Sequence, residues 1–198
     1  MSLSKKSIFL FETIKIQDGI AQNLIYHEQR IQNSINFSSK FNLEQILYTK
    51  KQGLIRAKVV YDLNGELVSV DFFEYKMKKF HTFQLVNIDF NYDKKYLDRS
   101  NIEAIKGSFD EVIMVKNSLI TDTSIANVAI FKNSHWITPK SPLLNGTTRQ
   151  RLLDENKIIQ DDLCVDDLLN VKRLAIFNSM IGFYEVQKFE IISQENLG

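Results

Sequence analysis

Residues 142–153 read "PLLNGTTRQRLL", in which a glycine and two threonines stand directly before a helix-forming run. The first amides of a helix have no partner within the helix, so a start of this kind favours the binding of an anion. The same letters also fit an ordinary capping box, with Thr147 at the N-cap and Gln150 three residues later. By itself the stretch favours the capping box, and the segments around it decide between the two interpretations.

The composition limits the classes of protein to which the chain can belong. It has 198 residues with 25 Lys plus Arg against 24 Asp plus Glu, so the net charge of +1 provides no field suited to nucleic acid or to an anionic membrane. The N-terminal segment has no long apolar run, and no stretch is long enough to cross a bilayer. We therefore expect a cytoplasmic protein whose partners include neither nucleic acid nor membrane.

Cysteine and histidine usage argues against a metal centre. Cys164 is the only cysteine, which excludes an internal disulfide framework and a cluster of several thiolates. The three histidines, His27, His81 and His135, are scattered and lack a metal-ligand spacing. The sequence therefore predicts no metal site and fits a reducing compartment.

The residue pattern predicts an α/β (α+β) protein of two domains, a smaller N-terminal domain at 1–89 and a β-rich C-terminal domain at 90–198. No low-complexity segment or flexible linker separates them, so a cleft between the domains is the default ligand site. We expect strands at 8–16, 20–26, 54–62, 67–75 and 80–90, a helix from His27, a short helix at 43–50, a helix-compatible segment at 91–108, and short strands from 109 onwards. The two "KNS" tripeptides, at 116–118 and 132–134, predict turns.

Several short motifs follow one another in a fixed order around the opening stretch. They are "FET" (11–13), "HEQR" (27–30), "LITDTSIANVAIF" (119–131), "SHWITP" (134–139) and "PLLNGTTR" (142–149). In this order they resemble the class IV aminotransferase and aminodeoxychorismate lyase family, the fold type IV enzymes that use pyridoxal 5'-phosphate. The resemblance covers most of the chain. It implies a two-domain fold, a homodimer, and a small-molecule substrate that carries an amino group and a carboxylate.

The resemblance implies a lysine that forms a covalent imine with the cofactor and later moves a proton at the substrate carbon. Lys94 and Lys95 are both candidates. Lyase-like members place an arginine four residues after this lysine, and Lys95 and Arg99 have that spacing, which predicts that both lie on one helical face. We therefore favour Lys95, although the run "DKKYLDR" is also typical of a solvated helix face.

The family's acid, which keeps the pyridine nitrogen protonated, aligns with Asp122. Most members have Glu there, and Asp is shorter by one methylene, so the strand must approach the cofactor more closely. Composition alone would favour a turn aspartate in "ITDTS". Ser124 and Asn127 belong to the same motif, and the resemblance implies that both bind the cofactor.

The phosphate of the cofactor needs a positive group and open amides. By resemblance, Arg30 occupies the position of the phosphate-binding arginine. The amides of Thr147 and Thr148 then supply the helix start, and Gly146 lets the backbone come close. A further donor is expected from the late strand "FNSM" (177–180), with Ser179 preferred and Asn178 as the second choice.

Recognition of the substrate is the least specific part of the pattern. An acidic substrate requires a cation, and Arg56, Arg99, Lys15 and Lys76 are the available choices. Arg56 lies in an expected strand, where an arginine is also typical of a surface cross-strand pair. Thr13 and Tyr75 complete the expected substrate-binding set, with Arg56 and Arg99.

Three functions remain open. The first is a lyase that converts 4-amino-4-deoxychorismate to 4-aminobenzoate and pyruvate, favoured by "Lys95-x-x-Asp98-Arg99", because branched-chain aminotransferases have Asn-Tyr at the last two positions. The second is a class IV aminotransferase acting on branched-chain or D-amino acids. The third is a scaffold that keeps the fold without catalysis.

Overall fold

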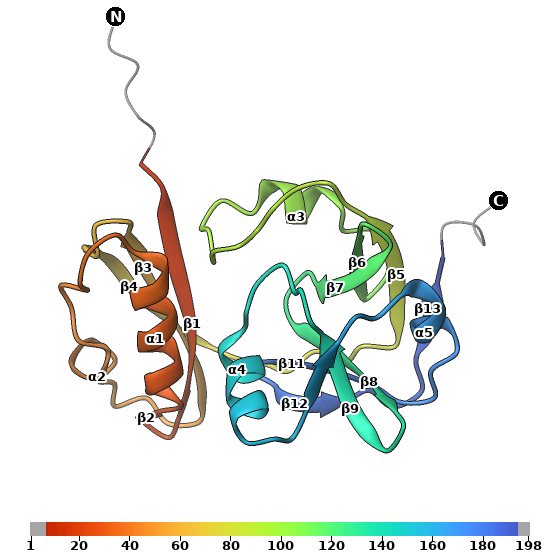
Figure 1. Ribbon diagram of the computed structural model, residues 1–198. Helices are drawn as coiled ribbons and strands as arrows, with labels where there is room; N and C mark the ends of the chain where they lie inside the picture. The colour runs from red at the N-terminus through yellow and green to blue at the C-terminus, as the bar shows by residue number, and fades with distance from the viewer. Residues whose placement is uncertain (1–6, 194–198) are drawn as a thin grey trace, which may run out of the picture. The chain divides into compact units, whose positions relative to one another are not determined.

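The computed structural model describes residues 7–193, which form two compact units (Figure 1). The first unit contains the described residues up to Lys76 together with Lys94–Asp98, and the second contains Met77–Asp93 together with those from Arg99 onwards. The units divide at Lys76 and not near residue 90, because the strand at 82–87 pairs with a strand of the second unit. The cleft expected between the two domains stays a prediction.

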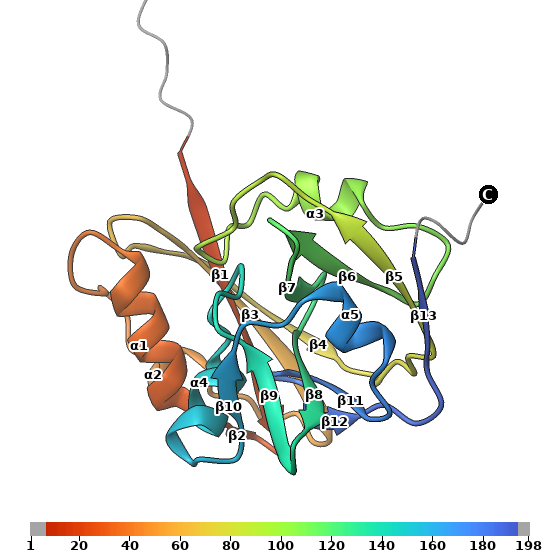
Figure 2. The ribbon, with the colours of Figure 1, turned by 45° about the vertical axis from the view of Figure 1, so that its right-hand side comes forward.

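The first unit is a four-stranded antiparallel sheet with two helices. Its elements are β1 (Phe9–Gln17), β2 (Ile20–Ala21), α1 (Leu24–Ser34), α2 (Leu43–Ile46), β3 (Leu54–Asp62) and β4 (Leu67–Glu74). The strands lie in the order β2-β1-β3-β4. Helices α1 and α2 cover one face of this sheet, and the opposite face carries no helix of this unit (Figure 1, Figure 2).

Buried apolar residues alternate along β1, and this alternation decides which face of the sheet is buried. Leu10, Ile14 and Ile16 are fully buried and pack in one cluster with Ile31 of α1. Side chains of a strand point to its two faces in turn, so Glu12 must lie on this same buried face. A carboxylate is thereby placed in an otherwise apolar core.

Helix α1 begins earlier than the sequence predicted. We expected a strand over 20–26 and a helix from His27, whereas β2 ends at Ala21 and α1 starts at Leu24. Asn23 has the left-handed conformation, with φ 55°, which asparagine tolerates better than most residues. The chain therefore turns directly from the short strand into the helix.

The segment around the two candidate lysines is not helical, so the prediction that Lys95 and Arg99 lie on one helical face is wrong. The Phe11 amide donates to the Lys95 carbonyl at 2.9 Å, and the Leu97 amide donates to the Phe9 carbonyl at 2.8 Å. Leu10 and Tyr96 form an antiparallel bridge. The segment thus runs along an edge of β1, and the helix α3 begins only at Ser100. Lys95 and Arg99 do not share a helical face.

The second unit is built on a nine-stranded sheet. Its elements are β5 (Thr82–Asn87), α3 (Ser100–Ala104), β6 (Glu111–Lys116), β7 (Leu119–Thr123), β8 (Asn127–Lys132), β9 (His135–Pro139), α4 (Thr147–Asp154), β10 (Ile159–Asp161), α5 (Val165–Leu169), β11 (Leu174–Asn178), β12 (Gly182–Glu185) and β13 (Glu190–Ile192). Strands β10, β9 and β8 lie side by side (Figure 2). The predicted mixed fold with a strand-rich C-terminal part is confirmed.

The two "KNS" tripeptides form the turns that the sequence predicted. Asn117 and Ser118 both have positive φ, 51° and 64°, and Asn133 and Ser134 repeat these values closely at 52° and 64°. Two left-handed residues in succession suit the twist of a two-residue hairpin. These turns set the order β6-β7 and β8-β9.

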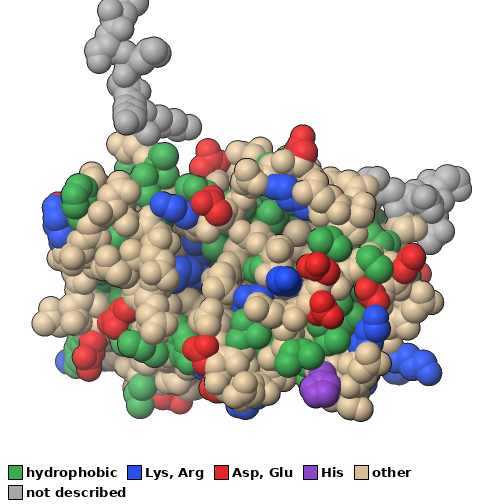
Figure 3. Space-filling view, in the orientation of Figure 1, with side chains coloured by type: hydrophobic (Ala, Val, Ile, Leu, Met, Phe, Trp, Pro, Cys, Tyr) green, Lys and Arg blue, Asp and Glu red, His purple; other side chains and the backbone are tan. Residues whose placement is uncertain are grey.

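Charged side chains of both signs are interspersed over the face of the molecule drawn in Figure 3, without a continuous basic band. Within residues 7–193 no helix is long and apolar enough to cross a membrane.

Replacement of Ile14 by Ala should lower the free energy of unfolding by about 2–5 kcal/mol, because it leaves a cavity in the fully buried cluster of the first unit. Urea unfolding followed by circular dichroism measures the change. Ile20→Ala is the matched control, since Ile20 is 67% exposed and its loss should shift stability by less than about 0.5 kcal/mol. Equal effects of the two variants would contradict the described core.

Candidate active site

Asp122 is a buried carboxylate of the second unit. It lies in strand β7 and is 5% exposed, so its interpretation as a turn residue is wrong. Its Oδ1 accepts from Asn127 Nδ2 at 2.6 Å, and its Oδ2 accepts from the Leu144 amide at 2.8 Å. Burial raises the pKa of Asp122 to about 7, although these hydrogen bonds and the Arg149 guanidinium oppose the rise.

The segment that leads into helix α4 is hydrogen-bonded to this carboxylate, because the Leu144 amide donates to Asp122 Oδ2. Helix α4 begins at Thr147, and its N-cap is Gly146, which has no side chain to bind the first amides. The capping-box interpretation, with Thr147 at the N-cap, is therefore wrong. Thr147 and Thr148 are each 6% exposed, so their amides lie in a largely dry environment.

A glycine is needed at position 146 because a side chain has no room there, and not because of the backbone conformation. Its φ of −68° is open to any residue. A Cβ built on it would lie 2.0 Å from Asn127 Oδ1, far inside the van der Waals limit. The backbone before α4 thus approaches the Asn127 side chain as closely as it can.

Arg149 is a buried cation that the sequence analysis missed, since an arginine in "TTRQR" is typical of a solvated helix face. It is 4% exposed and donates to the Pro139 carbonyl at 2.9 Å and to Asn145 Oδ1 at 3.0 Å. Burial lowers the pKa of Arg149, and the nearby Asp122 opposes this. In the sequence, the only sign that Arg149 would be buried is that it directly follows Thr147 and Thr148.

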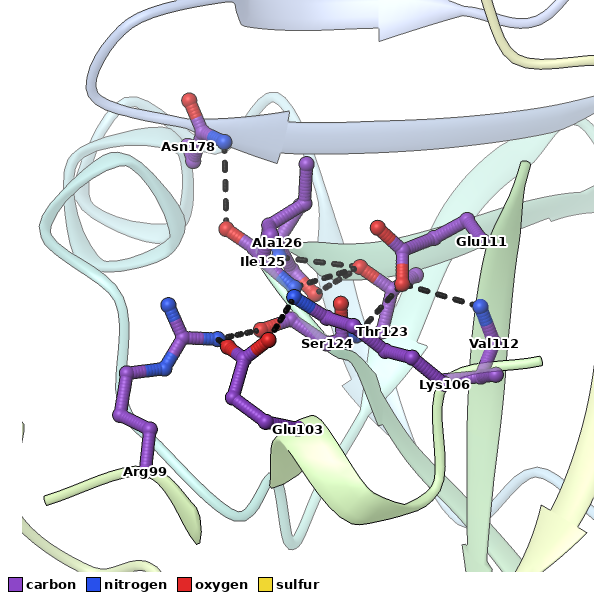
Figure 4. A network of polar contacts seen from close by, with 10 residues as sticks. All are labelled: Arg99, Glu103, Lys106, Glu111, Val112, Thr123, Ser124, Ile125, Ala126 and Asn178. Atoms are coloured by element: carbon purple, nitrogen blue, oxygen red, sulfur yellow. Dashed lines mark hydrogen bonds and ion pairs between the residues drawn. The ribbon is translucent and has the colours of Figure 1, made fainter. Parts of the chain in front are cut away.

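The turn between β7 and β8 is held by side chains from three other elements (Figure 4). Arg99 Nη2 donates to the Ser124 carbonyl at 2.6 Å, and Asn178 Nδ2 donates to the Ile125 carbonyl at 3.1 Å. Glu111, a buried acid that the sequence analysis did not single out, accepts from the Ser124 amide at 3.1 Å. Among the described residues, the buried Ser124 Oγ has no hydrogen-bond partner. A buried hydroxyl in this state is typical of a position that meets a ligand.

Asn178 and Ser179 follow one another at the end of β11. Asn178 Oδ1 accepts from the amides of Met180 and Ile181 at 2.9 and 3.0 Å, so its side chain shapes this turn. Asn178 Nδ2 also donates to the Ile125 carbonyl, so both the oxygen and the nitrogen of this side-chain amide form hydrogen bonds. The preference for Ser179 over Asn178 as a donor to the cofactor stays a prediction.

Arg30 belongs to a buried ion cluster in the first unit. Its Nε donates to Glu12 Oε1 at 2.9 Å, and its Nη2 also contacts the Glu12 carboxylate. His27 Nδ1 lies 2.5 Å from Glu12 Oε2. Burial alone would raise the pKa of Glu12, but Arg30 and His27 outweigh it and hold the value at about 2. Burial lowers the pKa of His27, which favours the neutral ring, although the contact with Glu12 opposes this.

The two candidate lysines have different surroundings. Lys94 Nζ donates to the Ser34 carbonyl at 2.8 Å. Lys95 Nζ lies 4.7 Å from the centroid of the Phe11 ring, and its charge contributes to the lowered pKa of His27. Lys95 is therefore the lysine near the Glu12–His27–Arg30 cluster, while Lys94 serves the end of α1.

The helix-free face of the first sheet carries several cations. Lys15 of β1 is directly opposite Arg56 of β3, and Thr13 is opposite Lys58. Like charges directly opposite each other are unfavourable unless an anion compensates them. Among the described residues Arg56 Nε is buried without a partner, while the guanidinium lies 4.8 Å from the centroid of the Phe73 ring. Burial raises the pKa of the neighbouring Tyr75, and Arg56 opposes the rise.

The predicted residues thus fall into two groups. Lys95, Arg30, Thr13, Arg56 and Tyr75 belong to the first unit. The second unit holds Asp122, Ser124, Asn127, Gly146, Thr147, Thr148, Asn178, Ser179 and Arg99. Among the described residues no group of three His, Cys, Asp or Glu could hold a metal ion.

Comparison with known proteins gives this arrangement a family. Residues 90–189 match the model of the amino-transferase class IV family. An uncharacterized protein of Haemophilus influenzae is 35% identical over 186 residues, which are 87% of this chain and 98% of that protein. The chain belongs to the class IV aminotransferase family. This family depends on pyridoxal 5'-phosphate, and its members are enzymes acting on small molecules.

Two members with a named activity are similar to this class IV protein. A crystal structure of "a putative 4-amino-4-deoxychorismate lyase" from Haemophilus somnus is 34% identical, covers 88% of this chain and 97% of its own, and has a TM-score of 0.79. A "Putative aminodeoxychorismate lyase" of Schizosaccharomyces pombe is 35% identical over 106 residues, 50% of this chain and 45% of that protein. The first of these relations spans both units.

The buried Asp122 makes the stability of the cofactor-free protein depend on pH. Its pKa is about 7 in the folded chain and near 3.8 when unfolded. The folded state thus binds the proton more tightly, and stability falls as pH rises from about 4 to about 7. Asp122→Asn, which cannot ionise, should remove this loss and gain on the order of a few kcal/mol relative to wild type at pH 8.

Urea unfolding of both proteins between about pH 4 and pH 8 measures the difference. A constant offset between wild type and Asp122→Asn over this range would show that the carboxyl is not perturbed.

Proposed function

We propose that the protein is a pyridoxal-phosphate-dependent lyase that converts 4-amino-4-deoxychorismate to 4-aminobenzoate and pyruvate. The observation that carries this proposal is the similarity at 34% identity to the Haemophilus somnus protein, which extends over nearly the whole of both chains. An activity of this kind would place the protein in folate biosynthesis, as a cytoplasmic homodimer.

The residues of the second unit fit the cofactor. Asp122 provides a buried carboxylate for the pyridine nitrogen, and a cation there would remove the penalty that burial imposes on the charge. The open amides of Thr147 and Thr148 suit a phosphate at a helix start. Ser124 Oγ supplies a buried hydroxyl without a partner among the described residues. When bound, the cofactor supplies a ring that accepts electrons as a substrate bond breaks.

The first unit would contribute the amine and a guanidinium. Lys95 would hold the cofactor covalently and then transfer a proton at the substrate carbon. Its charge acts on His27, so Lys95 lies in the surroundings of the cluster that contains Arg30. Arg30 would bind the phosphate while Glu12 fixes its orientation through Nε and Nη2.

The substrate class follows from the cationic face of the first sheet. Lys15 and Arg56 oppose each other across β1 and β3, and a carboxylate between them would relieve their repulsion. Thr13, two residues before Lys15 on β1, and Tyr75, on which the charge of Arg56 acts, would contribute hydroxyls. The substrate therefore carries at least one carboxylate beside its amino group. Arg99 would act from the second unit, next to Ser124.

A class IV aminotransferase is the second candidate, and the family match favours it directly. It would use the same lysine and acid, and would need an amino acid and a 2-oxo acid in turn. Arg99, where branched-chain aminotransferases have tyrosine, favours the lyase.

Purified protein incubated with pyridoxal 5'-phosphate should gain an absorbance in the visible range that borohydride bleaches. Lys95→Ala should abolish this reducible band, since no other amine would form the covalent bond. Lys94→Ala is the matched control and should keep the band, because Lys94 donates to the Ser34 carbonyl. A band that survives in Lys95→Ala and disappears in Lys94→Ala would transfer the role to Lys94. A protein that takes up no cofactor at all would support the scaffold.

The reaction itself is tested by adding 4-amino-4-deoxychorismate and measuring pyruvate with a coupled dehydrogenase. We expect pyruvate and 4-aminobenzoate in equal amounts, and no transfer of amino groups from common amino acids to 2-oxo acids. Arg56→Ala should raise KM by roughly tenfold or more through the loss of a charged hydrogen bond. Amino-group transfer without release of pyruvate would establish the aminotransferase in place of the lyase.

A further inference from the structure

Asn127 lies at the centre of a closed ring of hydrogen bonds in the second unit. Its Nδ2 donates to Asp122 Oδ1 at 2.6 Å and to the Leu144 carbonyl at 2.8 Å. The Leu144 amide in turn donates to Asp122 Oδ2 at 2.8 Å. The ring therefore joins strand β7, strand β8 and the turn before α4, and it uses both polar groups of the Leu144 peptide.

The geometry of the strands makes this ring possible. Asp122 and Asn127 are direct cross-strand partners of β7 and β8, so their side chains share one face of the sheet. Both are 5% exposed. Water therefore competes little with these hydrogen bonds, and a side chain that left the ring would bury an unpaired amide or carboxylate.

Gly146 places the next segment in contact with the same side chain. Because a Cβ at Gly146 would lie 2.0 Å from Asn127 Oδ1, the amide fixes how near the turn comes to β8. Helix α4 begins at the following residue. The position of the Thr147 and Thr148 amides thus depends on Asn127, although Asn127 lies on another element.

Both N–H groups of the Asn127 amide already donate to acceptors of the protein. We propose that Asn127 is a positioning residue that connects the acid Asp122 to the Leu144–Gly146 turn. The parts of the site that bind the pyridine and the phosphate of the cofactor are thereby held in a fixed relation to each other. This inference rests on the proposed function, and it replaces the direct cofactor contact that the resemblance implied for Asn127.

The electrostatic surroundings of Asp122 are consistent with this role. Hydrogen bonds from β8, through Asn127, and from the turn, through Leu144, favour its ionised form, as does Arg149 on α4. Removal of the Asn127 donor should therefore raise the pKa of Asp122 further above its ordinary value.

The test uses cofactor-free protein and two probes, pyridoxal 5'-phosphate and inorganic phosphate. Phosphate alone would meet the helix start and Arg30, whereas both N–H groups of the Asn127 side chain already donate within the protein. If Asn127 positions the turn, Asn127→Ala should weaken the binding of both probes by about tenfold. Retention of wild-type phosphate affinity together with weaker cofactor binding would overturn the proposal and indicate a direct contact with the ring.

Thr121→Val is the matched control, because Thr121 lies on β7 next to Asp122, is as buried as Asn127 at 5% exposed, and donates from Oγ1 to the Met114 carbonyl at 3.0 Å. The substitution removes one buried hydrogen bond but none of those among Asp122, Asn127 and Leu144. The affinities for pyridoxal 5'-phosphate and for inorganic phosphate should therefore stay within about twofold of wild type. A loss equal to that of Asn127→Ala would reduce the effect to general destabilisation and contradict the proposal.

A second measurement separates this inference from the proposed function. In urea unfolding, the loss of stability with rising pH should extend to a higher pH in Asn127→Ala than in wild type, whether or not the protein binds a cofactor. Gly146→Ala should also destabilise the wild type more than the Asn127→Ala background, where the amide that it meets is gone. Wild-type protein that binds neither probe would refute the proposed function. An unchanged pH profile and additive effects of the two substitutions would refute the role of Asn127.

Discussion

The desolvation of the Asp122 carboxylate governs the organisation of the second unit. A charge removed from water is costly unless hydrogen bonds or an opposite charge compensate it. Strand β8 supplies Asn127, the turn before α4 supplies the Leu144 amide, and α4 supplies the field of Arg149. These groups come from separate segments, so the acid is stable only when all of them are in place. The site therefore forms only when these segments pack together in the folded protein.

Two of the buried acids, Glu12 and Asp122, are stabilised in opposite ways. Glu12 is fully buried but lies against Arg30 and His27, and the pKa stays near 2. Asp122 has neutral donors at contact distance and a cation only at longer range, and the pKa rises to about 7. The first arrangement keeps a fixed charge that orients a guanidinium. The second leaves an acid that can share a proton with a ligand, which is what a pyridine ring requires.

The sequence predicts the elements whose signals are local, and the resemblance supplies the motif order. Alternation in β1 and the Asn-Ser turns needed no information from elsewhere in the chain, and the expected mixed fold is confirmed. The segment at 94–97 was predicted wrongly because its charges have helical spacing, whereas backbone hydrogen bonds to β1, more than eighty residues earlier in the chain, hold it in a non-helical conformation. Arg149 was missed for a related reason, since its acceptors on Pro139 and Gln160 lie on other strands. The roles of the site residues stay predictions.

The backbone at 94–97 bears on the choice between two adjacent lysines. It pairs with β1 around Tyr96, where the Phe11 amide donates to the Lys95 carbonyl. Lys94 reaches the end of α1 and Lys95 reaches Phe11, so the two neighbouring ammonium groups have different surroundings. An alignment that slides by one position here would therefore name the wrong lysine.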